Sequence, residues 1–194
     1  MSSIKLTADS NGGTFELKAP ASSSNTRVLT LPDTANGTVL TTTSPKAGNI
    51  IQVIEGTTQA RVDITSGTGT WTDTNLKASI TPSSSSNKVL VLVNGTLFTG
   101  NNSSGAVTVF RGGTGGTNIG DSTYGFFQGN ASGDSSNGAV MGCNLMKLDS
   151  PSTTSATEYI VKIKRVWAGS GGDTKFPSSN NNEISTITLM EVAA

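Results

Sequence analysis

The residues that most often carry chemistry are scarce in this chain. Its 194 residues include no histidine and a single cysteine, Cys143. This composition excludes Ser-His-Asp catalysis, cysteine-rich zinc sites and a disulfide within the chain. Cys143 lies in AVMGCNLMKL, an apolar setting in which a free cysteine behaves as a small hydrophobic residue. Without a histidine to activate it, we do not expect it to act as a nucleophile.

The acidic residues offer two further kinds of chemistry, calcium binding and glycoside cleavage by paired carboxylates. Four candidates lie in segments rich in Gly or Ser: Asp121, Asp134, Asp149 and Asp173. None of them shows the D-x-[DN]-x-[DN]-G spacing of a calcium loop. Aspartate also favours turns, because its side chain hydrogen-bonds to the nearby backbone. The sequence therefore predicts four turn residues, with no metal, no cofactor and no catalytic site, so we expect that the protein is not an enzyme.

The glycine-rich stretch RGGTGGTNIGD, residues 111–121, has the composition of a nucleotide-binding loop. A phosphate-binding loop requires a lysine after its last glycine, and this stretch has none. The dinucleotide fingerprint G-x-G-x-x-G fails as well, because Asn118 stands where the third glycine is needed after Gly113 and Gly115. We interpret the stretch as a long hairpin loop.

The charge distribution argues against nucleic acid as a partner. Thirteen basic and thirteen acidic residues balance, and the pI is about 6.2. The densest basic stretch is KIKRV, residues 162–166, in which Lys162 and Lys164 share one face of a strand, opposite Val161 and Ile163. We interpret this as a solvated strand face. The first residues lack the pattern of a signal peptide and no apolar run approaches a membrane span, so we expect no membrane insertion.

The elements that position these residues are predicted to be β-strands. Hydrophobic residues make up only 34% of the chain and charged residues 13%, and 23 glycines are present. Short clusters of Val, Ile and Thr alternate with polar turns, and no apolar pattern of helical period lasts three turns. This spacing is typical of a sandwich or barrel, and we predict an all-β, antiparallel, jelly-roll-like β-sandwich. The strongest predicted strands are NIIQVIE, NLKASIT, KVLVLVNGTLF, AVTVF, AVMGCNLMKL, EYIVKIKRVW and ISTITLMEV.

A domain boundary is predicted near TTTSPKAGN, residues 41–49. The preceding segment contains the predicted strands SIKLTA, TFELKA, RVLTL and TVLTT. About 44 residues with so few large apolar groups cannot build an independent core. We therefore predict that residues 1–44 form an attachment or strand-exchange module and that residues 45–194 form the sandwich.

The segment KVLVLVNGTLF is apolar on both faces of its predicted strand. One face holds Val89, Val91 and Val93, and the other holds Leu90, Leu92 and Phe98. AVMGCNLMKL repeats this pattern more weakly. One face can fill the core, and the other requires a second cover. A neighbouring subunit would supply that cover, and a long loop of the same chain is the alternative; the sequence leaves open which face meets the partner.

Five large aromatic residues are candidates for ligand binding: Trp71, Tyr124, Phe126, Phe127 and Trp167. Exposed rings beside Asn- and Gly-rich loops could stack on the apolar faces of sugars. The alternative is that they anchor the core or an interface, and we favour this interpretation because aromatic side chains bury large areas.

The two ends of the chain together resemble a known family. SIKLTADSNGGTFELKAP and RVLTLPDTANGTVLTT resemble the N-terminal module of virion structural and tail-fibre proteins of tailed phages, notably phages of aquatic bacteria. GNIIQVIEG, LKASITPSSSSNKVLVLVNG, LDSPSTTSATEYIVKIK and ISTITLMEVAA resemble the C-terminal β module of the same proteins. The ending STITLMEVAA is the most specific part. No repetitive shaft separates the two modules, which favours a short fibre or a capsid-surface knob.

The resemblance implies a homotrimer on the virion surface, assembled in the host cytoplasm. Its N-terminal module would dock on other virion proteins of the capsid or tail, and its β module would be displayed outward. Two hypotheses remain open. The chain is a structural surface protein, or it is a fibre tip that binds a carbohydrate of the host surface.

Overall fold

The computed structural model describes residues 3–7, 14–18, 45–131, 138–169, 172–179 and 183–194. The chain divides into two compact units, Met1–Val39 and Leu40–Ala194. All regular structure in the described residues is β, and none of them lies in a helix that could cross a membrane. The prediction of an all-β chain is confirmed.

In the first unit, β1 (Ser3–Thr7) pairs with β2 (Thr14–Lys18) in antiparallel register. Leu6 pairs with Phe15 across the hairpin, and its side chain is exposed. The predicted strands RVLTL and TVLTT lie outside the described residues. The predicted boundary at residue 44 also falls there and stays a prediction.

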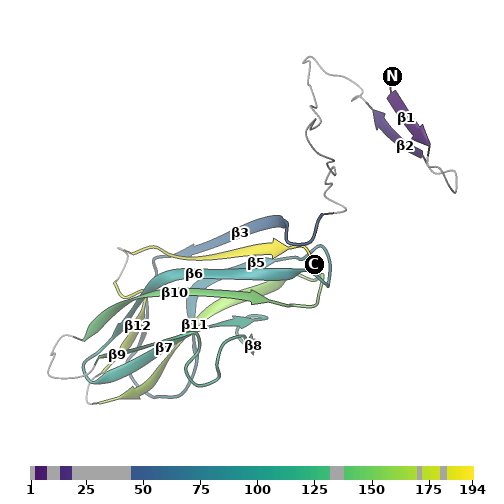
Figure 1. Cartoon of the computed structure of the whole chain (residues 1–194). Coiled ribbons are helices and arrows are strands. Elements are labelled where there is room, and N and C mark those ends of the chain that lie inside the picture. The colour runs from purple at the N-terminus through teal and green to yellow at the C-terminus, as the bar shows by residue number, and fades with distance from the viewer. Residues whose placement is uncertain (1–2, 8–13, 19–44, 132–137, 170–171, 180–182) are drawn as a thin grey trace. The chain divides into compact units, whose positions relative to one another are not determined.

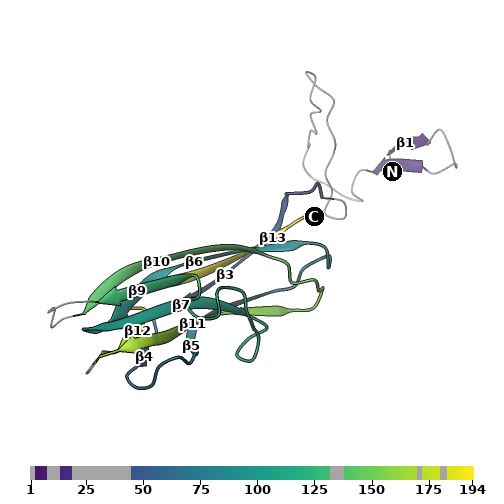
Figure 2. The same cartoon turned by 60° about the horizontal axis from the view of Figure 1, so that its bottom comes forward.

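The second unit contains two antiparallel sheets (Figure 1). The first sheet has the order β3 (Ile50–Thr58), β13 (Ser185–Val192), β6 (Lys88–Thr99), β12 (Thr174–Phe176) and β4 (Val62–Ile64), and β10 (Ala139–Asp149) pairs with the other edge of β6. The second sheet has the order β5 (Thr72–Ile80), β11 (Thr157–Ala168), β7 (Ser103–Arg111) and β8 (Thr117–Asn118), with β9 (Phe127–Ala131) also paired to β7. Figure 2 shows the two sheets as layers of a sandwich.

The strand order identifies the type of sandwich. The main strands form the rows β3–β13–β6–β10 and β5–β11–β7–β9. Counted along the chain without the short β4, β8 and β12, these rows read 1-8-3-6 and 2-7-4-5. This is the order of a jelly roll, which is built from two Greek keys. The predicted jelly-roll-like sandwich is therefore confirmed, although the sequence pattern did not predict the short strands β8 and β12.

The core lies between the sheets and is filled by every second residue of each long strand. In β6 the alternation buries Val89, Val91 and Val93, and in β11 it buries Tyr159, Val161 and Ile163. Each of the valine and isoleucine side chains contributes about 1.5–3 kcal/mol when fully buried. Cys143 belongs to the same core, and burial raises the pKa of its thiol to about 12. It behaves as the small hydrophobic residue that the sequence predicts.

The two ends of the second unit meet at one end of the sandwich. The amide of Gly48 donates to the carbonyl of Ala193 at 2.9 Å, and the amide of Ala193 donates to Asn49 at 2.9 Å. The described part of the second unit therefore begins beside its own C-terminus.

Candidate interaction surface

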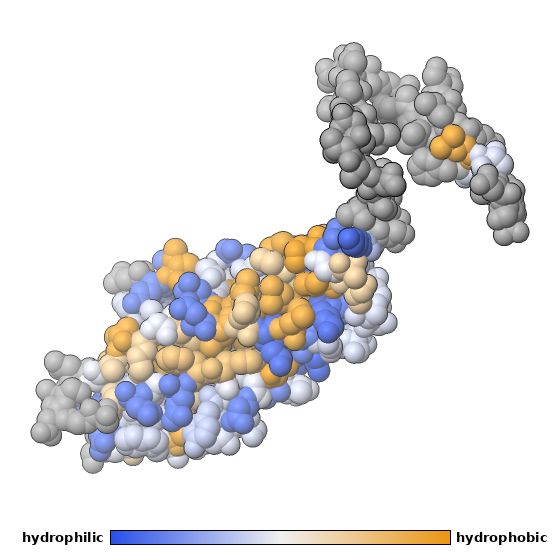
Figure 3. Space-filling model, in the orientation of Figure 1, coloured by the Kyte–Doolittle hydropathy of each residue, from blue (hydrophilic) through white to orange (hydrophobic). Residues whose placement is uncertain are grey.

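The outward side of the β10–β6–β13–β3 sheet is largely apolar. The strand register places one row of side chains across it: Leu148, Leu90, Met190 and Val53. The adjacent row holds Met146, Leu92, Thr188 and Glu55. We call the six apolar side chains of these two rows the apolar face. Met146 is 72% exposed and Val53 is 54% exposed, and Figure 3 shows apolar side chains gathered as a band over this sheet.

The apolar face follows from the two-sided strand β6. Because the valine set fills the core, Leu90 and Leu92 point outward and are half-buried by their neighbours. The prediction of two apolar faces is confirmed, and the structure decides which set is open. Phe98 is partly capped by its own chain, since the ammonium of Lys175 lies 4.7 Å from the centre of its ring.

A shallow hollow of about 350 Å³ lies beside the second row. Its outward side chains combine amides and hydroxyls with apolar groups: Leu92, Asn94, Asn144, Met146, Thr186 and Thr188. Such a mixture is typical of surfaces that bind another protein, because it buries apolar area and also offers hydrogen bonds.

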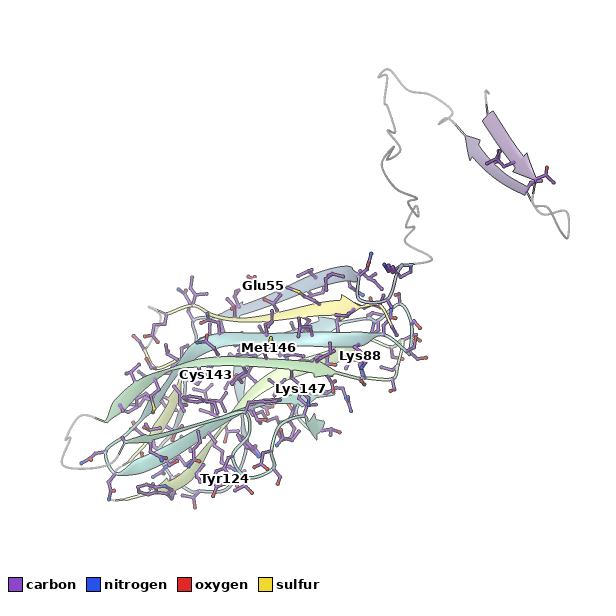
Figure 4. All side chains as sticks on the ribbon, viewed as in Figure 1. Glu55, Lys88, Tyr124, Cys143, Met146 and Lys147 are labelled. Carbon is purple, nitrogen blue, oxygen red and sulfur yellow. The ribbon has the colours of Figure 1, made fainter. Side chains whose placement is uncertain are left out.

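Unpaired charges of opposite sign flank the apolar face. Glu55 ends the second row on the β3 side, and Lys147 follows Met146 in the edge strand β10 (Figure 4). Lys88 stands at the start of β6. None of the ion pairs formed between described residues includes any of these three charges. They are free to pair with another molecule.

The outward side of the second sheet is covered by the same chain. Lys162 and Lys164 of β11 are only 4% and 5% exposed, so the interpretation of KIKRV as a solvated strand face is wrong. The ammonium of Lys162 lies 2.7 Å from a carboxylate oxygen of Asp73 and donates to the carbonyl of Thr114 at 2.5 Å. Lys164 donates to the carbonyl of Ser122 at 3.4 Å. The segment 112–126 supplies both carbonyl groups.

Aromatic rings complete this cover. Trp71 and Phe110 meet edge to face with their ring centres 6.4 Å apart. The ammonium of Lys164 lies 4.3 Å from the centre of the Trp71 ring, and that of Lys162 lies 4.2 Å from the Phe110 ring. Burial raises the pKa of Asp73, but hydrogen bonds from Lys162 and Thr114 and the charge of Lys162 outweigh this, so the pKa is lowered. Burial lowers the pKa of Lys164.

The five candidate aromatics do not form one site. Trp71 lies beneath the loop cover and donates to the carbonyl of Ser122 at 3.2 Å, and Phe126 and Phe127 pack against the core. Tyr124 and Trp167 are exposed. No ring contact joins these two among the described side chains. The preferred interpretation as anchors holds for three of the five.

The candidate aspartates have different environments. Asp121 accepts hydrogen bonds from the amides of Thr123 and Tyr124, which confirms a turn role and lowers its pKa. Asp173 pairs with Lys175 at 2.6 Å. Asp149 contradicts the turn prediction, because it ends β10, is buried and pairs with Arg111.

Asp134 lies outside the described residues. No group of three His, Cys, Asp or Glu side chains in the described part of the chain could hold a metal ion.

The glycine-rich stretch is a hairpin, as predicted. Arg111 pairs with Thr117 in the register of β7 and β8, and Gly112 and Gly113 have φ values of 92° and 77°. These positive angles explain why glycine is required at this turn. The hairpin loop belongs to the segment that covers the lysines.

Two buried charged residues were missed by the sequence prediction, Glu191 and Arg165. Glu191 is inward-facing in β13 and accepts hydrogen bonds from Gln52, Ser83 and Asn87 at 2.6–2.7 Å. Burial raises the pKa of Glu191, but the hydrogen bonds from these donors outweigh burial, so the pKa is lowered. The alternation of STITLMEV places Glu191 on the same face as Ile187 and Leu189, and this pattern could have revealed its burial.

The comparisons with known proteins identify no family for this chain. No family model and no curated protein matches it. Among solved structures it is similar to the VP2 subviral particle of infectious bursal disease virus, with 13% identity and a TM-score of 0.36 over 97% of this chain and 46% of that chain.

A structure of the Gt strain of the same virus gives 14% identity and a TM-score of 0.37 over 97% of this chain and 47% of that one. This chain thus spans about half the length of the solved structures that it matches. TM-scores this low do not support an inference about shared fold or function.

Proposed function

We propose that this protein is a structural subunit of a virion that assembles with copies of itself through the apolar face. The observation that carries the assembly role is that this sheet leaves six apolar side chains fully or partly exposed, while the other sheet is covered by its own chain. The virion setting is supported by the sequence resemblance to tailed-phage surface proteins. The jelly roll adds an analogy at the level of fold, because capsid and lectin domains often use it.

The energetics favour a covered apolar face. A fully buried Leu, Met or Val contributes roughly 1.5–3 kcal/mol, and the two rows contain six such residues in each copy. Soluble monomers rarely expose continuous apolar patches of more than a few hundred Å². Burial of this face against another copy would therefore stabilise an oligomer without many ion pairs.

The flanking charges favour a closed ring of subunits. In a ring, the β3 side of one copy meets the β10 side of the next, because the contact is head-to-tail and must close. Glu55 of one copy would then approach Lys147 of its neighbour. The sequence resemblance implies a ring of three, so we propose a homotrimer, either a short fibre or a capsid decoration.

The N-terminal module is proposed to dock on the particle. A two-stranded hairpin such as β1–β2 is only marginally stable alone in water. Deletion of residues 1–44 should leave the sandwich folded but prevent its attachment to particles, as measured by co-sedimentation. Normal decoration by the truncated chain would refute the docking role.

The assembly role is tested by measuring native mass with light scattering at micromolar concentration. We expect a trimer for the natural chain and a folded monomer for Leu92→Asp. Tyr124→Asp is the matched control, because it adds the same charge at an exposed residue outside the apolar face. A natural chain that is monomeric would refute the proposal.

Glycan binding is the second candidate function. The exposed rings of Tyr124 and Trp167 favour it, because rings can stack on sugars. A glycan array separates the two candidates. Saturable binding that is lost in Tyr124→Ala or Trp167→Ala would support a receptor-binding tip, and no binding would leave the structural role. We propose no catalytic role, consistent with the burial of Cys143.

A further inference from the structure

A small polar pocket lies between the two sheets. Its volume is about 130 Å³. Ile64 of β4 contributes from the first sheet, and Thr72 of β5 and Arg165 of β11 contribute from the second. The loop between β4 and β5 supplies the remaining lining residues: Ser66, Gly67, Thr68 and Thr70.

Arg165 is an uncompensated charge in this pocket. Its side chain lines the pocket, and the residue is only 6% exposed. Its Nε atom has no hydrogen-bond partner, and none of the ion pairs between described residues includes it. Arg111 shows the usual alternative, since its guanidinium donates to both carboxylate oxygens of Asp149 at 2.9 Å.

A buried guanidinium without an ion-pair partner favours the binding of an anion. The guanidinium of arginine carries a positive charge in proteins, so the burial of Arg165 leaves a charge that needs a partner. A charge removed from water is strongly unfavourable unless it is paired. The planar fork of N–H donors matches the oxygens of phosphate, sulfate or carboxylate, which bind it in bidentate fashion.

Further donors line the same pocket as the guanidinium. Ser66, Thr68 and Thr70 of the loop and Thr72 of β5 each carry a hydroxyl that can donate to an oxyanion. The loop is tied to β11, because the amide of Gly69 donates to the carbonyl of Arg165 at 2.8 Å. Gly67 and Gly69 have φ values of 72° and 83°, which other residues rarely adopt. The loop conformation that forms the pocket therefore requires glycine at these two positions.

We propose that this pocket binds a small oxyanion through Arg165. Its volume of about 130 Å³ accommodates one phosphate, sulfate or carboxylate group. The group comes either as a free ion or as a carboxylate of another chain. The shared chemistry is an oxyanion held by one guanidinium and a set of hydroxyls.

The test measures the melting temperature of the full chain during titration with sodium phosphate, sodium sulfate or sodium acetate at constant ionic strength. We expect a saturable rise. Saturation with phosphate or sulfate assigns a free oxyanion, whereas saturation with acetate alone assigns a carboxylate group from another chain. Phosphate and sulfate also stabilise proteins without binding, but that effect does not saturate.

Variants of the pocket make the test specific. Arg165→Met should abolish the saturable rise, and it should melt at the same or a higher temperature than the natural chain in chloride alone, because an unpaired buried charge is gone. Arg61→Met is the matched control, since Arg61 pairs with Asp63 outside the pocket. It should keep the anion response.

A second variant keeps the test decisive if Arg165→Met does not fold. Thr68→Val keeps the charge and removes a hydroxyl donor, so it should weaken anion binding about tenfold. The proposal is overturned if no anion gives a saturable response in the natural chain. It is also overturned if the response survives in Arg165→Met or is unchanged in Thr68→Val.

Discussion

The outward faces of the two sheets differ in exposure, and the difference is the opposite of what their hydrophobicity predicts. The face of β11 that carries Lys162 and Lys164 is buried, whereas the face of β6 that carries Leu90 and Leu92 is open. The basic face is covered by the segment 112–126 of the same chain. The apolar face has no cover from the described residues.

The chemistry of loops explains this difference. A loop that lies on a sheet brings backbone carbonyl groups that need hydrogen-bond donors. Lysine ammonium groups supply those donors, as Lys162 does for Thr114 and Lys164 for Ser122. Leucine and methionine cannot supply them, so a polar loop on the apolar face would lose its bonds to water without replacement. Another folded surface is the better cover for such a face.

The largest expected effect is a difference in stability between substitutions on the core side and on the outward side of β6. Val91→Asp places a carboxylate in the core and should destabilise the sandwich by about 4 kcal/mol or more, a large part of the stability of a typical domain. Leu92→Asp should leave the monomer folded. Circular dichroism during urea unfolding measures both. Equal loss of folding in the two variants would show that Leu92 also belongs to the core of one chain.

The next largest effect concerns the covered face, which is the face of β11 that carries Lys162 and Lys164. Lys162→Ala removes the ion pair with Asp73 and the hydrogen bond to Thr114, and we expect a loss of about 2–3 kcal/mol because Asp73 remains partly exposed. The oligomeric state should not change. Lys77→Ala is the matched control, since Lys77 pairs with Glu158 at an exposed site and should cost under about 1 kcal/mol. Similar losses in both variants would argue against a structural role for the cover.

Acid should weaken the covered face. The folded-state pKa of Asp73 lies below its ordinary value of 3.8, so its stabilising contribution is present above pH 3.8 and is lost as the pH falls through the lowered value. The melting temperature of the natural chain should exceed that of Asp73→Asn at pH 6, and the gap should narrow towards pH 2. A constant gap across this range would contradict the prediction.

The smallest expected effect concerns the charges beside the apolar face. Glu55→Lys should weaken oligomer assembly by about 0.2–1 kcal/mol per contact, because such rim pairs are screened by water and salt. The double variant Glu55→Lys with Lys147→Glu should restore the natural affinity. Analytical ultracentrifugation at low and high salt measures both. Failure of the double variant to restore assembly would place these residues in different contacts.

The strand positions and the core were predictable because their signals are local. Alternation along residues 88–98 and 157–168 specifies which side chains share a face, whatever the rest of the chain does. Cys143 and the valine set of β6 are buried as such patterns indicate. The short strand β12 escaped prediction because three residues, Thr174–Phe176, carry too little periodicity.

Residue patterns along the chain were enough to specify the all-β architecture, the two-sided strand β6 and the turn role of the glycine-rich stretch. The packing of the folded chain specifies that the leucine set is open, that Lys162 and Lys164 are buried, and that Asp149 pairs with Arg111. It also places Arg165 in a pocket without a carboxylate partner among the described residues. Periodicity fixes which residues lie together on a strand, but burial depends on what packs above that strand. Here the cover comes from segments distant in sequence, which no local pattern records.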